Sequence, residues 1–129
     1  MSMDTGRIEV IVENVEPEGG AVHIALHNKD NFLNSRPPLT GLIRAPNGAE
    51  QVKGALQPMP YGTYAVAVYQ DRNGNGKLDK NALGIPTEPY AFSNNPTVKW
   101  KPPSFSEAAV ALNAPKVTVS VRLRYWKEY

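Results

Sequence analysis

The sequence contains no cysteine, and this absence excludes disulfide bonds, thiolate metal sites and cysteine nucleophiles. It also contains no apolar run near the ~18 residues that a transmembrane helix needs, so no membrane-spanning segment is expected. An excess of one charge is lacking too, since fourteen basic residues stand against twelve acidic ones, a net charge of +2. This balance argues against a nucleic-acid partner, which would favour a strongly basic surface.

The first residues lack the apolar region of a signal peptide. They read Met-Ser-Met-Asp-Thr-Gly, which fits either a native cytosolic start or a tag remnant joined to a mature chain. We expect residues 1–5 to be disordered or tag-derived. The length of 129 residues predicts a single domain, residues 1–129, with one hydrophobic core.

Apolar residues alternate with other residues in four segments, and no segment of a dozen residues shows a helical period. Such alternation is typical of strands with one buried face. The alternating residues are Ile8, Val10 and Val12; Val22, Ile24 and Leu26; Tyr64, Val66 and Val68; and Val117, Val119, Val121 and Leu123. Weaker strand candidates are residues 41–44, 49–56 and 108–112. Residues 30–36 and 105–109 can each hold a helical turn, with Ser104 as a cap for the second.

Short strands separated by turn signals predict an all-β fold, an antiparallel Greek-key β-sandwich of about seven strands, immunoglobulin-like in architecture. Residues 84–103 interrupt this spacing with five prolines. Proline donates no backbone hydrogen bond, which excludes a central strand there. The segment is too apolar for disorder, so we expect an ordered cover over the sandwich.

An oxygen-rich loop follows the third of the four strong strands. Its oxygens fall at positions one, three, five, seven and nine of an EF-hand-type calcium loop, with glycine at position six. These residues are Asp71, Asn73, Asn75, Lys77 (through its backbone carbonyl) and Asp79. Calcium takes about 6–8 oxygen ligands, and alternate residues of a tight turn can aim their oxygens at one point. Only two of the side chains are charged, so we expect weak binding, with a Kd on the order of 10⁻⁴–10⁻³ M.

The twelfth position of this loop is Ala82, where an EF-hand has a bidentate glutamate. Glu88 follows Asp79 by nine residues and can fold back to supply the missing ligand; its alternative role is a surface carboxylate that accepts from backbone amides. The loop as a whole has an alternative as well. Two Asn-Gly pairs are strong turn signals, and a metal-free turn would favour the same residues.

Three linked blocks carry a resemblance to a known family. They are Gly-Thr-Tyr-Ala-Val-Ala-Val-Tyr-Gln-Asp at 62–71, Asn-Gly-Asn-Gly-Lys-Leu-Asp at 73–79, and residues 83–95. Together with residues 103–109 and 117–125 they resemble the bacterial domain-of-unknown-function 2141 family of small exported β-proteins. The resemblance covers most of the chain, with residues 62–112 as its diagnostic part. It implies a prealbumin-like or carboxypeptidase-regulatory-like sandwich and a periplasmic or extracellular location, and it implies no activity.

Catalytic chemistry finds little support in the sequence. Ser93 stands in Phe-Ser-Asn-Asn and not in a Gly-x-Ser-x-Gly motif, and such a run is typical of a tight turn. His23 and His27 lie four apart on one strand, which separates them by roughly 13 Å, too far to share a metal ion. Both are expected on the partly exposed face of the sheet.

Aromatic residues near the prolines offer a binding surface. Tyr90, Phe92 and Trp100, together with Trp126, can form a platform for sugars or peptides, or can pack the cover onto the core. We therefore expect a non-enzymatic, exported β-sandwich in which calcium orders the long loop for contact with an unknown protein or glycan. The alternative is a carbohydrate- or peptide-binding module that uses the loop aromatics, and a cryptic hydrolase comes third.

Overall fold

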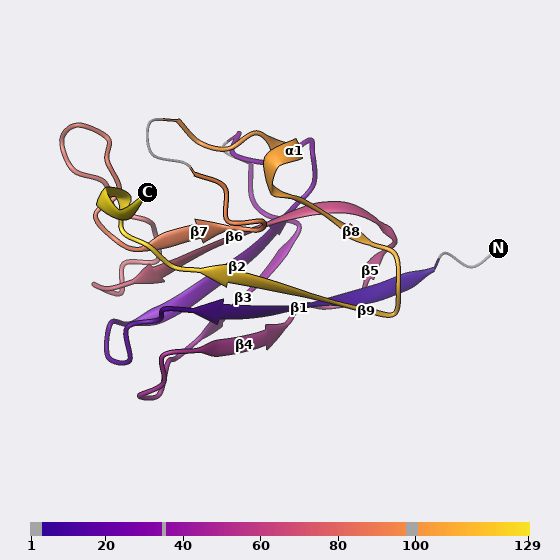
Figure 1. Ribbon diagram of the computed structural model, residues 1–129, viewed down its shortest axis with the longest axis horizontal. Helices are drawn as coiled ribbons and strands as arrows, with labels where there is room; N and C mark the ends of the chain where they lie inside the picture. Colours follow the sequence, from indigo (N-terminus) through magenta and orange to yellow (C-terminus); the bar gives the residue numbers. More distant parts are fainter. Residues whose placement is uncertain (1–3, 35, 98–100) are drawn as a thin grey trace.

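The computed structural model describes residues 4–34, 36–97 and 101–129, in which two β-sheets pack face to face (Figure 1). The strands are β1 (Thr5–Glu13), β2 (Ala21–His27), β3 (Thr40–Arg44), β4 (Val52–Ala55), β5 (Met59–Pro60), β6 (Gly62–Asp71), β7 (Tyr90–Phe92), β8 (Ala109–Leu112) and β9 (Lys116–Arg122). Two short helices, α1 (Phe105–Ala108) and the 3₁₀ helix η1 (Trp126–Glu128), complete the described elements. Seven strands remain among the described residues when the short β5 and β7 are left out. The predicted all-β sandwich of about seven strands is therefore confirmed. Its Greek-key connectivity stays a prediction.

The first sheet is built on β1. β4 pairs with it in antiparallel orientation, β5 pairs antiparallel with its first two residues, and β9 runs parallel to it through seven residue pairs. This parallel pair is the exception to the antiparallel arrangement that we expected. No hairpin joins β1 to β9: the chain enters β9 from β8, which belongs to the other sheet, so the orientation of β9 is set by that crossover.

The second sheet has the order β3-β2-β6, and β7 and β8 both pair with β6. The four alternating runs place their apolar residues between the two sheets, as predicted. Ile8, Val10, Val22 and Leu26 have at most 1% of their surface exposed. Burial of apolar surface at ~25 cal/mol per Å² is the main stabilising term of such a core.

Two local predictions have different outcomes. Residues 29–33 form turns and not a helix, and Asn31 fixes them through its side chain, which accepts from the amide of Asn28 at 2.9 Å and donates to the carbonyl of Pro37 at 3.1 Å. The helical turn after residue 104 is confirmed as α1. Ser104 and Glu107 form a reciprocal capping box at its start.

The N-terminal prediction needs a correction for two residues. Thr5 begins β1 and pairs with Pro60, and the carbonyl of Asp4 accepts a hydrogen bond from the amide of Tyr61 at 3.0 Å. Thr5 is therefore part of the sheet and Asp4 is hydrogen-bonded next to it, while residues 1–3 lie outside the described part of the chain. No described helix is long and apolar enough to cross a membrane.

The proline-rich segment contributes a short strand. β7 pairs with β6 on one side, and Tyr90 forms a two-way backbone bridge with Arg124, with N–O distances of 3.0 and 3.2 Å. Because Arg124 follows β9, this bridge connects the two sheets at one end of the sandwich. The loop after β6 and the helix η1 lie at that end (Figure 1, left).

Candidate functional site

The predicted calcium loop leaves the sheet at a buried carboxylate. Asp71 is the last residue of β6 and is only 2% exposed. Its two oxygens accept from the backbone amides of Asn75, at 3.3 Å, and Gly76, at 2.7 Å. Gly74 and Gly76 have φ angles of +71° and +77°, which a glycine adopts without steric cost. The carboxylate at position one therefore folds the loop around itself.

The side chains at positions three, five and nine meet on the outer part of the loop. Asp79 accepts from the side-chain amides of Asn73, at 2.5 Å, and Asn75, at 2.6 Å. The amide oxygens of the two asparagines accept from backbone N–H groups further along, including that of Lys77 at 3.2 Å. The alternation seen in the sequence thus brings these oxygen-bearing groups together in space.

Glu88 lies inside the loop, as the sequence suggested, but it is not a surface residue. It is 3% exposed, and its two oxygens accept from the amides of Arg72, at 2.6 Å, and Asp79, at 2.8 Å. The carboxylate therefore joins the two ends of the nine-residue loop. In this arrangement Glu88 has the amide-bonding role that was the alternative to direct metal ligation.

The three carboxylates create a negative environment beside the sheet. Burial, followed by the charges of Asp71, Glu88 and Asp79, raises the pKa of Tyr69 to about 12. The ring of His23 stacks on Tyr69 with centroids 4.7 Å apart, and its Nε2 lies 3.5 Å from Asp71. Such an environment attracts a cation.

The ligand set for a cation is mixed. Among the described residues no three His, Asp or Glu side chains are grouped so that they hold a metal by themselves. A site in this loop therefore depends on the asparagine side chains and backbone carbonyls as well as on Asp71 and Asp79. Oxygen donors of this kind suit calcium, which accepts amide and carbonyl ligands.

The chain then departs from the path of an EF-hand. Lys80 and Pro86 form an antiparallel bridge, and the amide oxygen of Asn81 accepts from the amides of Leu83 and Ile85. Ala82 lies exposed in this small turn. The twelfth position therefore belongs to a separate turn that follows the loop.

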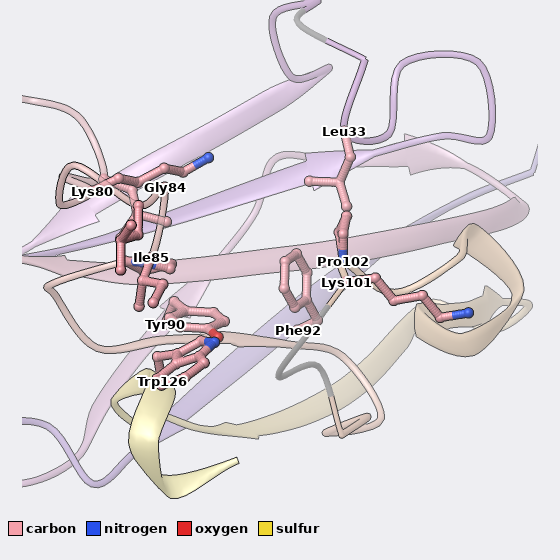
Figure 2. A pocket seen from close by; sticks show the side chains of 12 residues that line it. Leu33, Lys80, Gly84, Ile85, Tyr90, Phe92, Lys101, Pro102 and Trp126 are labelled. Carbon is pink, nitrogen blue, oxygen red and sulfur yellow. The ribbon is translucent and has the colours of Figure 1, made fainter.

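The same turn forms one wall of a cavity of about 460 Å³ (Figure 2). The opposite walls come from β7, from η1 and from residues before β3 and α1. The apolar side chains that line it include Leu33, Leu78, Leu83, Ile85, Pro86, Tyr90, Phe92, Pro102 and Trp126.

Two residues of the predicted aromatic platform, Tyr90 and Phe92, line this cavity. Tyr90 is 6% exposed and meets Phe92 edge-on, with centroids 6.3 Å apart, while Tyr129 stacks on Tyr90 at 4.9 Å. Trp100 lies outside the described residues. Trp126, the fourth member of the predicted platform, lines the cavity together with Tyr90 and Phe92.

The two other chemical candidates occupy structural positions. Ser93 is fully buried; its hydroxyl accepts from the amide of Val66 at 2.9 Å and donates to the carbonyl of Ala108. His27 packs edge-on against Phe32, with centroids 5.9 Å apart, and burial lowers its pKa, partly opposed by hydrogen bonding with Asn31. Neither group forms a nucleophile–base pair in the described contacts.

Comparison with known proteins gives one match. Over residues 10–120 the chain matches the family described as "Uncharacterized protein conserved in bacteria (DUF2141)". This match spans most of the chain and includes both the oxygen-rich loop and most of the cavity wall. No curated protein and no solved structure matches the chain.

Proposed function

Because this chain belongs to the bacterial family DUF2141, whose description carries no activity, we propose its function from the site itself. The protein is a non-enzymatic, calcium-stabilised β-sandwich of the bacterial envelope, and the calcium loop at residues 71–79 orders a longer binding loop. The observation that carries this proposal is the folding of the loop around Asp71, with the side chains of Asn73, Asn75 and Asp79 brought together beside it.

The bonds within the loop support a cation that replaces them. The side-chain amides of Asn73 and Asn75 each donate one hydrogen bond to Asp79, whose charge remains, and each amide group also carries an oxygen. A modest rotation of these side chains turns oxygens inward. Calcium would then be bound by Asp71, Asn73, Asn75, the carbonyl of Lys77 and Asp79, and Glu88 would hold the two loop ends.

The connection to binding is the continuity of the chain. The loop ends at Asp79, and the next residues, from Lys80 to Pro86, form a wall of the cavity. A cation that fixes Asp79 therefore also fixes the start of that wall. Weak binding of this kind gives constant occupancy only where calcium is near millimolar, which supports a periplasmic or extracellular location.

Thermal melting in calcium and in chelator tests the proposal. Calcium that binds only the folded state adds RT ln(1 + [L]/Kd), about 1.4 kcal/mol at ten times the Kd, or a rise in Tm of about 5 °C for a domain of this size. Asp79→Asn removes one charge without changing shape and should abolish most of this increment. Asp30→Asn, a matched change at an exposed position away from the loop, should keep it.

Two further substitutions define the geometry. Asn73→Asp adds charge at position three and should tighten calcium binding. Ala82→Glu should leave it unchanged, since residue 82 lies exposed in the separate turn that follows the loop. A melting curve that is identical in calcium and chelator, with a neutral Asp79→Asn variant, would reduce the loop to an Asn-Gly turn.

The second candidate function is a binding module that uses the loop aromatics. The observation in its favour is the cavity that Tyr90 and Phe92 share with Trp126. A cryptic hydrolase centred on Ser93 has no comparable support, because that hydroxyl is buried and bonded to the backbone.

A further inference from the structure

The cavity between the 78–86 segment, β7 and η1 has the size and chemistry of a small-molecule site. Its volume of about 460 Å³ falls within the ~300–1,000 Å³ typical of such sites and equals roughly fifteen water molecules at ~30 Å³ each. Its walls are formed mainly by aliphatic and aromatic side chains. Figure 2 shows Ile85, Tyr90 and Trp126 on one side and Phe92, Pro102 and Leu33 on the other.

The charges around the cavity have one sign. Lys80 and Lys101 are its charged lining residues, and none of the described residues that line it is acidic. A neighbouring hollow shares Ile85, Pro86 and Trp126; its charged lining residues among those described are Lys127 and Arg72, and Arg72 is paired with Glu16 at 3.2 Å. An apolar site with a positive rim favours a ligand that has an apolar body and a negative group.

The two lysines differ in availability. Hydrogen bonds from Ser104 lower the pKa of the Glu107 carboxyl, the charge of Lys101 adds to this effect, and the Lys101 ammonium points away from the cavity (Figure 2). Lys80 also lines the cavity, and its ammonium is directed toward the side where Leu33 lies (Figure 2). No carboxylate of the described residues lies within 4.0 Å of the Lys80 ammonium. Lys80 is therefore the cation that a bound anion would meet.

Leu33 adds an independent indication of a binding site. Its φ angle is +54°, in the left-handed region that a large side chain rarely adopts, and its side chain is 47% exposed at the rim of the cavity. Core packing does not require such a conformation, since the side chain is half in solvent. Residues in such sparsely populated backbone conformations cluster at active sites and ligand clamps.

We propose that this cavity binds a small amphipathic acid, with its hydrocarbon or aromatic body between Tyr90, Phe92 and Trp126 and its carboxylate at Lys80. The inference rests on the second candidate function, the binding module, and not on calcium. A sugar fits less well. The polar groups of the described lining are two ammonium ions, a phenol and an indole, and these offer few acceptors for sugar hydroxyls.

Calorimetric titration of the full chain with three ten-carbon probes tests the charge preference. Decanoate should bind saturably at one site, decanol about tenfold more weakly, and decyltrimethylammonium without detectable heat. Lys80→Met keeps an apolar stem and removes the charge, so it should weaken decanoate about fivefold and leave decanol unchanged. The matched control Lys53→Met, at an exposed position on β4 in the other sheet, should leave both probes unchanged.

Leu33→Gly separates a binding role from a structural one. It relieves the positive φ, so the melting temperature should rise or stay equal, while the affinity for both decanoate and decanol should fall about fivefold. A lower melting temperature with unchanged affinity would show that Leu33 serves the fold and would remove this support.

The same titrations in calcium and in chelator keep the two proposals apart. Saturable decanoate binding in a protein whose melting ignores calcium would uphold the cavity and overturn the calcium loop. Calcium-dependent melting without decanoate binding would do the reverse. Equal affinity for decanoate and decanol, or a Lys80→Met variant that binds decanoate like the unaltered chain, would overturn the assignment of an anionic ligand.

Discussion

The buried polar side chains of this protein bond to the backbone where regular pairing stops. Gln70 is fully buried, accepts from the amide of Glu16 at 2.9 Å and donates to the carbonyls of Glu16 and Gly20 at 2.8 and 3.0 Å. Glu88 and Ser93 do the same at other loops. An unpaired buried amide or carbonyl costs about 1–3 kcal/mol, so each of these side chains stabilises one loop end.

Glu88→Gln should lower the free energy of unfolding by about 2 kcal/mol, because one of the two amides would face a donor in place of a charged acceptor. Urea unfolding in chelator measures the effect, with the exposed Glu50→Gln as the matched control. A loss that is seen only in calcium would instead make Glu88 a metal ligand.

Ser93→Ala should destabilise the fold by about 1–3 kcal/mol, since it leaves an amide of β6 and a carbonyl of α1 without their partner. Ser120→Ala, at an exposed position of β9, is the control and should change stability by less than about 0.5 kcal/mol. If both variants unfold at the same urea concentration, the hydrogen bonds of the Ser93 hydroxyl do not stabilise the fold.

At the scale of elements, β6 is paired along one edge by two strands with a gap between them. β8 pairs with residues 62–65 and β7 with residues 67–69. Val66 lies in the gap, and Ser93 fills it with both its backbone amide and its hydroxyl. Ser93 follows β7 directly, so the proline-rich segment completes the pairing along this edge of β6.

The helix α1 depends on its cap. The hydroxyl of Ser104 accepts from the amide of Glu107 at 3.3 Å, and the carboxylate of Glu107 accepts from the amide of Ser104 at 2.9 Å. Ser104→Ala should lower the free energy of unfolding by about 1 kcal/mol, as measured by thermal melting. Ser106→Ala, inside the helix, should lower it by less. An equal loss in both would show that their mutual side-chain contact, and not the cap, matters.

The elements that the sequence predicted are those with a strong local pattern. Strict alternation gave the four longest strands, and Ser104 with Glu107 is a local start signal for a helix. What could not be predicted depends on partners distant in the chain. Nothing in β1 or β9 indicates that they run parallel, and a three-residue strand such as β7 is too short for a period.

The candidate site divides in the same way. Spacing alone predicted that Asp71, Asn73, Asn75 and Asp79 would meet. The sequence left two roles open for Glu88, metal ligand or acceptor for backbone amides. The prolines around it stiffen the chain but do not indicate how deeply its side chain is buried. The cavity needed the structure, since its walls come from five separate parts of the chain.

At the scale of the whole molecule, partly buried tyrosines predict a loss of stability at alkaline pH. Burial raises the pKa of Tyr69 and of Tyr125 to about 12, above the ordinary value of 10.0, and the charge of nearby carboxylates contributes in both cases. A raised pKa in the folded state gives stability that is complete below pH ~10 and is lost as the pH rises through ~12.

The melting temperature should therefore fall between about pH 10 and 12, and Tyr69→Phe should make that fall shallower. Tyrosinate absorbance during the same titration should lag behind that of the unfolded chain. Between about pH 7 and 9 the variant and the unaltered protein should show the same pH slope, which serves as the control. Tyrosines that ionise near pH 10 in the folded protein would contradict this expectation.

The parallel pairing of β1 and β9 also determines how the protein resists a mechanical load. These strands are the first and the last, and seven residue pairs hold them side by side. A force that pulls the two chain ends apart draws β1 and β9 in opposite directions along their length. The evenly spaced bonds of a parallel ladder then bear the load together, in shear, and must break at once. In a terminal hairpin they would open one after another, so this topology should raise the force that is needed to unfold the domain from its two ends.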